Sequence, residues 1–293
     1  MNGFWRRLRL TLEMIKFEHS VFALPFALTA AMLAWRESGF RTEGLGWRLF
    51  WIVIAMVSAR SAAMTFNRIL DADIDGRNRR TAPRALPAGL LTVRFAWVFT
   101  LVSTLVFFWA SQQLGRLCLI LAPVALAIIF TYSYAKRFTM LAHLWLGLAL
   151  GIAPAAAWIA IRGTLDPRIL WLTVAVMCWT AGFDVIYACQ DFEFDRTEGL
   201  CSIPRRFGVK NALFIARALH VGMIACLLSL VFAFSLGTLS LVGVAAVIAL
   251  LGYEHGLVKP NDLSRVNAAF FTVNGYVSLL FFAFWTADIL KHR

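Results

Sequence analysis

The chain has 293 residues, of which 60% are hydrophobic and only 15% are charged, and its mean hydropathy is +0.73. Soluble domains average roughly 45–50% apolar and about 25% charged residues, so this composition excludes an ordinary soluble core and indicates a membrane protein. The net charge of +12 does not indicate a nucleic-acid partner, because the basic residues lie between long apolar runs rather than on one amphipathic face.

Apolar runs long enough to cross a bilayer recur along the whole chain. A transmembrane helix needs about 20 mainly apolar residues, and the eighth of nine candidate segments is short by this measure. The nine segments are residues 20–36, 47–66, 93–112, 116–135, 139–161, 168–188, 211–233, 238–253 and 266–287. Because no segment is left for a soluble domain, residues 1–293 are predicted to form one all-α, polytopic membrane domain of about nine helices.

The distribution of basic residues predicts how these spans are oriented. With the N-terminus inside, 17 Lys and Arg residues fall in cytoplasmic segments and 8 fall on the opposite side. This bias follows the positive-inside rule and predicts a cytoplasmic N-terminus and an external C-terminus. Residues 67–92 and 189–210 then become two long polar loops on the cytoplasmic side, where loops of a compact bundle usually carry function.

Half of the 16 acidic residues fall in two short windows at this face. Within each window polar side chains recur every four residues, which places them on one stripe of a helix. The first stripe is formed by Asn67, Asp71 and Asp75, and the second by Tyr187, Asp191 and Asp195, with Asp184 on the same face. Carboxylates at a membrane boundary repel one another and are costly to desolvate, so the two stripes predict a bound cation.

Magnesium is the cation that this pattern favours. It prefers oxygen ligands and is commonly bound by one or two carboxylates together with substrate phosphates. Two acidic stripes that face each other across a central cavity, open to the cytoplasmic side, would hold Mg²⁺ between themselves and a diphosphate. The nearby cations Arg60, Lys136 and Arg137 are expected to complete the neutralisation of that diphosphate.

Two other interpretations of the acidic residues fit the sequence less well. The segment 71–76 resembles the start of an EF-hand calcium loop, but the glutamate expected at its twelfth position is Ala82, so calcium is not indicated. A transporter with an acidic vestibule would need ionisable residues along a path through the bundle. The middles of the predicted spans are nearly free of charge, with the exception of Arg60.

The two acidic motifs resemble those of the UbiA superfamily of intramembrane prenyltransferases, and the resemblance covers nearly the whole chain. Residues 84–89 (RALPAG) and 132–137 (YSYAKR) are similar to two further motifs of that family, and Arg60 stands seven residues before Asn67 as a basic residue does there. Residues 15–26 and 189–204 resemble the bacterial 4-hydroxybenzoate polyprenyltransferase-like branch. That branch includes members assigned to menaquinone synthesis by the futalosine route.

The sequence departs from this pattern at one position. Many relatives have a lysine after the glycine that follows the second motif, whereas here Gly199 is followed by Leu200. If that lysine contacts diphosphate elsewhere, then Arg196, Arg205 or Arg206 must take its place, or the substrate differs.

The resemblance implies Mg²⁺-dependent transfer of a polyprenyl group from a polyprenyl diphosphate to an aromatic acid of the 4-hydroxybenzoate type. The setting would be ubiquinone or menaquinone biosynthesis at the bacterial inner membrane. A menaquinone-precursor, haem or chlorophyll type of prenyltransferase of the same superfamily is an alternative, and a cation-binding transporter is the other. Prenyl chain length, the aromatic acceptor and the oligomeric state stay open.

The resemblance also implies a role for each candidate residue. The metal is expected to be held by Asn67, Asp71, Asp75, Asp191 and Asp195. The substrates are expected to be bound by Asn67, Arg60, Lys136, Arg137 and Arg196. Asp184 and Tyr187 are expected to orient the aromatic acceptor or to shield the allylic cation.

Overall fold

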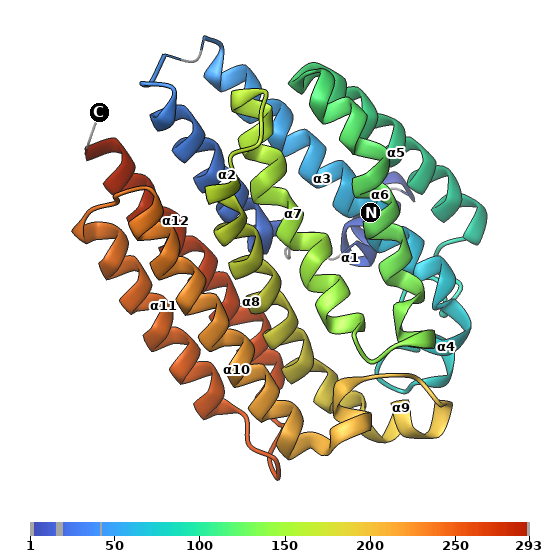
Figure 1. Cartoon of the computed structure of the whole chain (residues 1–293). Helices are drawn as coiled ribbons and strands as arrows, with labels where there is room; N and C mark the ends of the chain where they lie inside the picture. Colours follow the sequence, from blue (N-terminus) through green and yellow to red (C-terminus); the bar gives the residue numbers. More distant parts are fainter. Residues whose placement is uncertain (1–2, 16–19, 42, 292–293) are drawn as a thin grey trace.

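In the computed structural model the chain forms a bundle of long helices that run roughly side by side (Figure 1). The structure describes residues 3–15, 20–41 and 43–291. Residues 16–19, which belong to one of the stretches that resemble the family, lie outside the described residues. Within the described ranges there is no named β-strand, only an isolated bridge between Lys259 and Asp262, so the all-α prediction is confirmed.

Eight helical segments of the described chain are long and apolar enough to cross a membrane. They lie in α3 (Leu45–Leu70), α5 (Val93–Leu114), α6 (Arg116–Phe138), α7 (Ala142–Arg162), α8 (Leu170–Ala188), α10 (Ile203–Ala233), α11 (Thr238–Leu257) and α12 (Asn274–Lys291). A further helix, α2 (Ser20–Glu37), packs against α7 and α12 within the bundle. The expectation of about nine spans in a multi-pass membrane protein therefore holds.

Short elements gather at one end of the bundle. There α3 is followed by α4 (Ala72–Arg77), and α8 is followed by a 3₁₀ turn (Cys189–Asp191) and α9 (Phe192–Glu198) (Figure 1). The chain re-enters the bundle from each of these segments at a capped helix start. Thr92 accepts a hydrogen bond from the amide of Phe95 at α5, and Ser202 accepts one from the amide of Arg205 at α10, as N-cap side chains do.

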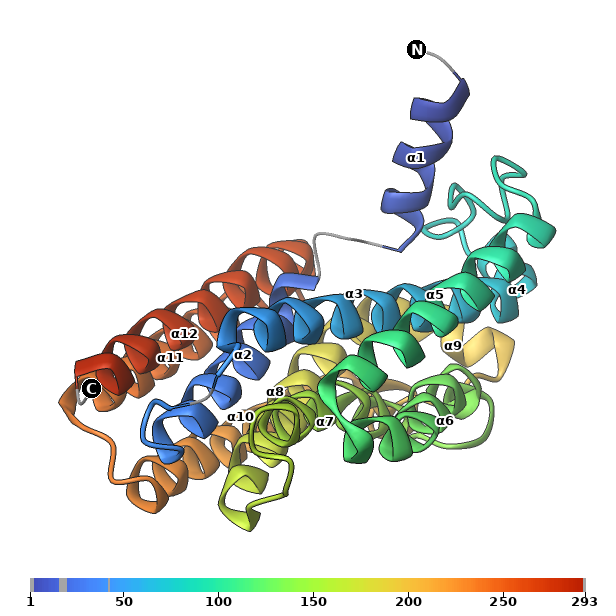
Figure 2. The ribbon, with the colours of Figure 1, turned by 90° about the horizontal axis from the view of Figure 1, so that it is seen from above.

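The first helix, α1 (Gly3–Met14), projects from the body of the bundle (Figure 2). Its last residue, Met14, is buried in a small apolar cluster with Leu86 and Leu91, which belong to the segment between α4 and α5. Burial of these side chains therefore anchors the end of α1 to the same loop that carries several arginines of the site described below.

Helices α7 and α8 approach closely because glycines face α8 at two successive turns of α7. A Cβ atom on Gly147 would overlap with the backbone oxygen of Met177, and one on Gly151 would lie 2.7 Å from the backbone oxygen of Thr173. Small residues spaced by four are a common means of bringing membrane helices into backbone contact. This contact fixes the relative position of the two helices that later contribute His143 and Asp184.

Gly147→Ala is therefore expected to be destabilising although alanine is the better helix former. The added methyl group must push α8 away, and forced overpacking typically costs about 1–3 kcal/mol. Thermal unfolding of the purified protein in detergent would measure the loss. The matched control is Gly252→Ala, because a Cβ atom there meets nothing within 4 Å; equal melting temperatures for the two variants would contradict the close-packing argument.

At the opposite end of the bundle a buried carboxylate caps α11 from another helix. Asp288 of α12 is 1% exposed and accepts hydrogen bonds from the amide of Gly237 at 2.6 Å and from the hydroxyl of Ser240 at 2.9 Å. These donors belong to the first turn of α11, where amides have no partner within the helix. These two hydrogen bonds therefore connect α11 to α12.

Asp288→Ala is expected to destabilise the protein by about 1–3 kcal/mol, since it leaves buried donors without an acceptor. Asp288→Asn keeps one acceptor oxygen and is expected to lose less. Thermal unfolding in detergent distinguishes the two, and a melting temperature for Asp288→Ala equal to that of the wild type would show that the remote cap contributes nothing.

Candidate active site

The two acidic windows meet at the α4 and α9 end of the bundle, where a cavity of about 230 Å³ lies between them. We call it the polar cavity. Ten of the eleven side chains that the sequence singles out border it, namely Arg60, Asn67, Asp71, Asp75, Lys136, Arg137, Asp184, Tyr187, Asp191 and Asp195. The eleventh, Arg196, lies on the exposed side of α9 and does not border the cavity.

The first acidic stripe lies where α3 passes into α4. Asn67, on the last turns of α3, donates a hydrogen bond from Nδ2 to Oδ2 of Asp71 at 3.1 Å. One turn further on, Asp75 is buried, and a guanidinium nitrogen of Arg84 lies 2.6 Å from both of its carboxylate oxygens. Arg68 lies 3.8 Å from the same carboxylate and is itself largely buried. The continuous helical stripe that the spacing predicts is thus interrupted at Asp71, but its side chains stay on one side.

The second stripe is bound from across the cavity by the loop that follows α4. Arg80 donates from Nε to Oδ1 of Asp191 at 3.0 Å and from a terminal nitrogen to Oδ2 at 2.6 Å, which is a bidentate ion pair. The same guanidinium donates to the Tyr187 hydroxyl at 3.0 Å, and Asn78 donates to Asp191 at 3.2 Å. Residues 78–84 therefore bridge the two acidic stripes.

Charge and burial shift the protonation of the groups outside the spans. Burial raises the pKa of Asp71 above its ordinary value, although Lys136 and the hydrogen bond from Arg137 oppose this effect. Burial disfavours the charged form of Arg80, but its hydrogen bonds to Asp191 outweigh this effect and raise its pKa. Arg80 therefore stays charged, and Asp71 is one of the carboxylates whose negative charge a further cation would stabilise.

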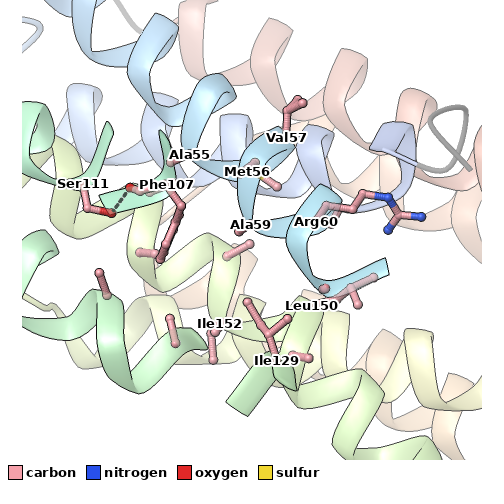
Figure 3. A pocket seen from close by; sticks show the side chains of 18 of the residues that line it. Ala55, Met56, Val57, Ala59, Arg60, Phe107, Ser111, Ile129, Leu150 and Ile152 are labelled. Atoms are coloured by element: carbon pink, nitrogen blue, oxygen red, sulfur yellow. Dashed lines mark hydrogen bonds between the residues drawn. The ribbon is translucent and has the colours of Figure 1, made fainter. Parts of the chain in front are cut away.

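The polar cavity adjoins a second cavity of about 210 Å³ whose lining is almost entirely apolar (Figure 3). We call it the apolar cavity. It extends between α3, α5, α6 and α7 and includes Ala55, Phe107 and Ile152. Six side chains line both cavities, with Arg60 and Asn67 among them, so the charged and the apolar space meet there. In Figure 3 the guanidinium of Arg60 points away from the apolar side chains.

Comparison with known proteins identifies this arrangement. Residues 23–285 match the family model described as the UbiA prenyltransferase family. The chain belongs to this family. It is 29% identical over 289 residues to a 4-hydroxybenzoate octaprenyltransferase of Cupriavidus metallidurans, covering 97% of this chain and 96% of that one. A protein of the same name from Vibrio atlanticus is 31% identical over 239 residues, which are 80% of this chain and 83% of that one.

Solved structures agree with the family assignment. A UbiA homologue from Aeropyrum pernix K1 superposes with a TM-score of 0.83 at 33% identity, over 92% of this chain and 98% of that one. A UbiA homologue from Archaeoglobus fulgidus, solved with DMAPP and Mg²⁺, has a TM-score of 0.71 at 18% identity, over 96% and 99% of the two chains. Because the identity to the second structure is only 18%, this similarity supports the shared fold alone. The UbiA-family chain is thus a membrane-embedded prenyltransferase. The alternative interpretation as a cation-binding transporter is not supported by these similarities.

Sequence reasoning missed several side chains of this UbiA-family cavity. Arg80 and Asn78 stand in a loop without periodicity, and only the charge of that long loop hinted at them. Arg84 belongs to the motif of residues 84–89, but that resemblance does not assign it to the site. His143 is fully buried and hydrogen-bonds Asp184, a contact between two helices that no sequence spacing encodes.

The departure after Gly199 has a structural counterpart in this family member. Arg205 donates hydrogen bonds to the backbone oxygens of Gly199 and Leu200, at 2.6 and 2.8 Å, so its guanidinium holds the loop. Leu200 borders the polar cavity, whereas neither Arg205 nor Arg206 does. None of the three arginines that were expected to substitute for the lysine faces the cavity, and its cations come instead from α3, from residues 78–84 and from the end of α6.

Proposed function

We propose that the chain transfers a polyprenyl group from a polyprenyl diphosphate to an aromatic acid of the 4-hydroxybenzoate type, in a Mg²⁺-dependent reaction of respiratory quinone biosynthesis. The observation that carries the proposal is the junction of two cavities: one is lined by carboxylates and cations, and the other is apolar. A prenyl diphosphate has the same two parts. The names of the relatives in Cupriavidus and Vibrio support the aromatic acid as acceptor.

The side chains fit a magnesium ion that is shared with the substrate. Asp195 is 2% exposed and its buried Oδ2 atom has no hydrogen-bond partner among the described residues, which is a costly state that a cation would relieve. The donors offered by Asn67, Asp71, Asp75 and Asp191 are oxygens, as magnesium prefers. Among the described residues no three acidic, histidine or cysteine side chains form a metal cage of their own. Magnesium held by one or two carboxylates and by phosphate oxygens does not require one.

When bound, Mg²⁺ would supply charge stabilisation for the departing diphosphate. The chain's own cations add to it: Lys136, Arg137, Arg80 and Arg84 border the same cavity and are placed to contact phosphate oxygens. The allylic cation formed as the C–O bond breaks would lie beside Tyr187, whose aromatic face stabilises positive charge. The apolar cavity would take up the prenyl tail and exclude water from this cation.

The active-site end is proposed to face the cytoplasm, as the bias of basic residues predicts. This orientation would give the polar cavity access to water-soluble aromatic acids. Single cysteines placed in the loop after α4, on a background without the five native cysteines, should react with a membrane-impermeant thiol reagent only from the cytoplasmic side.

The decisive experiment incubates the purified protein, in detergent or in vesicles, with Mg²⁺, a polyprenyl diphosphate and a panel of aromatic acids, and identifies products by mass. A prenylated 4-hydroxybenzoate-type acid that disappears on chelation of the metal is the expected result. Absence of any prenylated aromatic acid, with another acceptor modified instead, would overturn the proposed acceptor but not the family.

A further inference from the structure

A buried histidine holds one carboxylate of the polar cavity in a way that sets this carboxylate apart from the others. His143, on the first turn of α7, is 0% exposed, and its Nδ1 atom lies 2.6 Å from Oδ2 of Asp184 on α8. The close approach of α7 and α8 at Gly147 and Gly151 keeps the two side chains in register. Asp184 borders the polar cavity, whereas His143 does not.

The hydrogen bonds of His143 fix which ring nitrogen carries the proton. The backbone amide of Ile203 points at its Nε2 atom at 3.4 Å, and an amide can only donate. Nε2 is therefore the acceptor, and the neutral ring carries its proton on Nδ1, from which it donates to Asp184. His143 thus donates from Nδ1 to Asp184 and accepts at Nε2, so its role is to orient the carboxylate.

Three of the other four aspartates that border the polar cavity are bound by arginines, and the fourth, Asp195, is almost fully buried and is assigned above to the metal. Asp71, Asp75 and Asp191 each form an ion pair with a guanidinium at 3.2 Å or less. Among the described residues Asp184 forms no ion pair with an arginine or lysine within 4 Å, and its Oδ1 atom accepts no hydrogen bond; Lys136 borders the same cavity. A carboxylate that is oriented through one oxygen and free at the other is suited to accept a proton at the free oxygen.

Aromatic side chains lie beside this free carboxylate. Tyr187 stands one turn after Asp184, its ring centroid is 4.3 Å from that of Phe270, and the ring centroid of Phe183 is 5.1 Å from that of Phe270. All three border the polar cavity. A flat aromatic substrate can pack against such rings at a favourable offset or edge-on geometry.

We propose that Asp184 is the base that removes the ring proton of the aromatic acceptor, and that His143 is the residue that positions it. This inference rests on the proposed function. The allylic C–O bond breaks with its electron pair leaving on diphosphate, and a π-electron pair of the ring forms the new C–C bond. The hydrogen on the attacked carbon then passes as a proton to Asp184, its bonding pair restores the aromatic ring, and water later takes the proton from Asp184.

The test compares His143→Leu, which removes the donor, with His143→Asn, whose side-chain amide can reproduce the Nδ1–H donor. It measures prenylated acid and released diphosphate separately, with acceptors that carry hydrogen or deuterium on the attacked carbon. His143→Leu is expected to lower kcat for prenylation by roughly 10–100-fold, as loss of a supporting hydrogen bond does elsewhere. The KM for the prenyl diphosphate should stay unchanged, while diphosphate release continues and yields prenyl alcohol.

A kinetic isotope effect distinguishes a positioning role of His143 from a merely structural one. The positioning role predicts the following result. With the base displaced, proton removal should limit the rate, so His143→Leu should show an isotope effect that the wild type lacks, and His143→Asn should restore wild-type behaviour. Equal losses of prenylation and diphosphate release, without an isotope effect, would overturn the inference. If His143→Leu does not fold, Asp184→Asn must show the same uncoupling, and coupled turnover in that variant refutes the base. A wild-type protein that prenylates no aromatic acid would instead refute the proposed function.

Discussion

Asp71→Ala and Asp191→Ala are each expected to lower prenyl transfer by at least about 10²-fold, the size of effect seen when one charge-stabilising group is removed from an active site. Both carboxylates border the polar cavity, and they come from the two different acidic stripes. Each loss removes a proposed contact to the cation that neutralises the diphosphate. Activity is measured as product formed in membranes that contain equal amounts of inserted protein.

The matched control is Asp73→Ala. Asp73 lies between the two carboxylates of the first stripe, but its side chain is exposed and it does not border the cavity. It removes the same charge from the same segment, so near-normal activity is expected. If Asp73→Ala loses as much activity as Asp71→Ala, the effect is one of overall charge at this face, and the assignment of Asp71 to the metal falls.

Ala122→Phe is expected to select against long prenyl donors. Ala122 lines the apolar cavity on α6, fourteen residues before Lys136, which borders the polar cavity; the two positions are thus separated by roughly 21 Å along the helix. A phenyl ring at this depth would block the far part of the apolar cavity. Overpacking typically costs about 1–3 kcal/mol. The kcat/KM for a long polyprenyl diphosphate should therefore fall by about tenfold or more, since about 1.4 kcal/mol corresponds to tenfold. The kcat/KM for a short donor should change little.

Ala127→Phe is the control for this substitution. Ala127 lies on the same helix but is exposed on the outside of the bundle and does not line the cavity. Competition between a short and a long donor in one reaction gives the ratio of the two kcat/KM values directly. An unchanged ratio in Ala122→Phe would show that the prenyl tail does not occupy this cavity.

The charge balance of the site explains why a single chain can hold so many carboxylates at a membrane boundary. Each unpaired carboxylate would be costly there. Arg80, Arg84 and Arg137 lower this cost by pairing with Asp191, Asp75 and Asp71. The loop of residues 78–84 therefore supplies two of the three arginines that neutralise these carboxylates. A family comparison limited to the acidic motifs does not include this loop.

Much of this protein follows from its sequence alone. Long apolar runs can satisfy their backbone hydrogen bonds in a bilayer only as helices, so the all-α membrane fold and the approximate number of spans could be predicted from composition and length. The spacing of four between Asn67, Asp71 and Asp75, repeated at Tyr187, Asp191 and Asp195, indicated a common face because helical periodicity is local. For the same reason ten of the eleven selected side chains do border one cavity.

Only the tertiary structure decided how these local features combine. Arg80 reaches Asp191 across a separation of 111 residues, and His143 reaches Asp184 across 41. Such pairs depend on how helices pack, and although the spacing of Gly147 and Gly151 indicates that α7 packs closely against a neighbour, it does not say which helix that neighbour is. Arg196 shows the converse, since proximity in sequence to Asp195 did not bring it into the cavity. The sequence thus determined which helix faces bear charge, and the packing of the helices decided which charges meet.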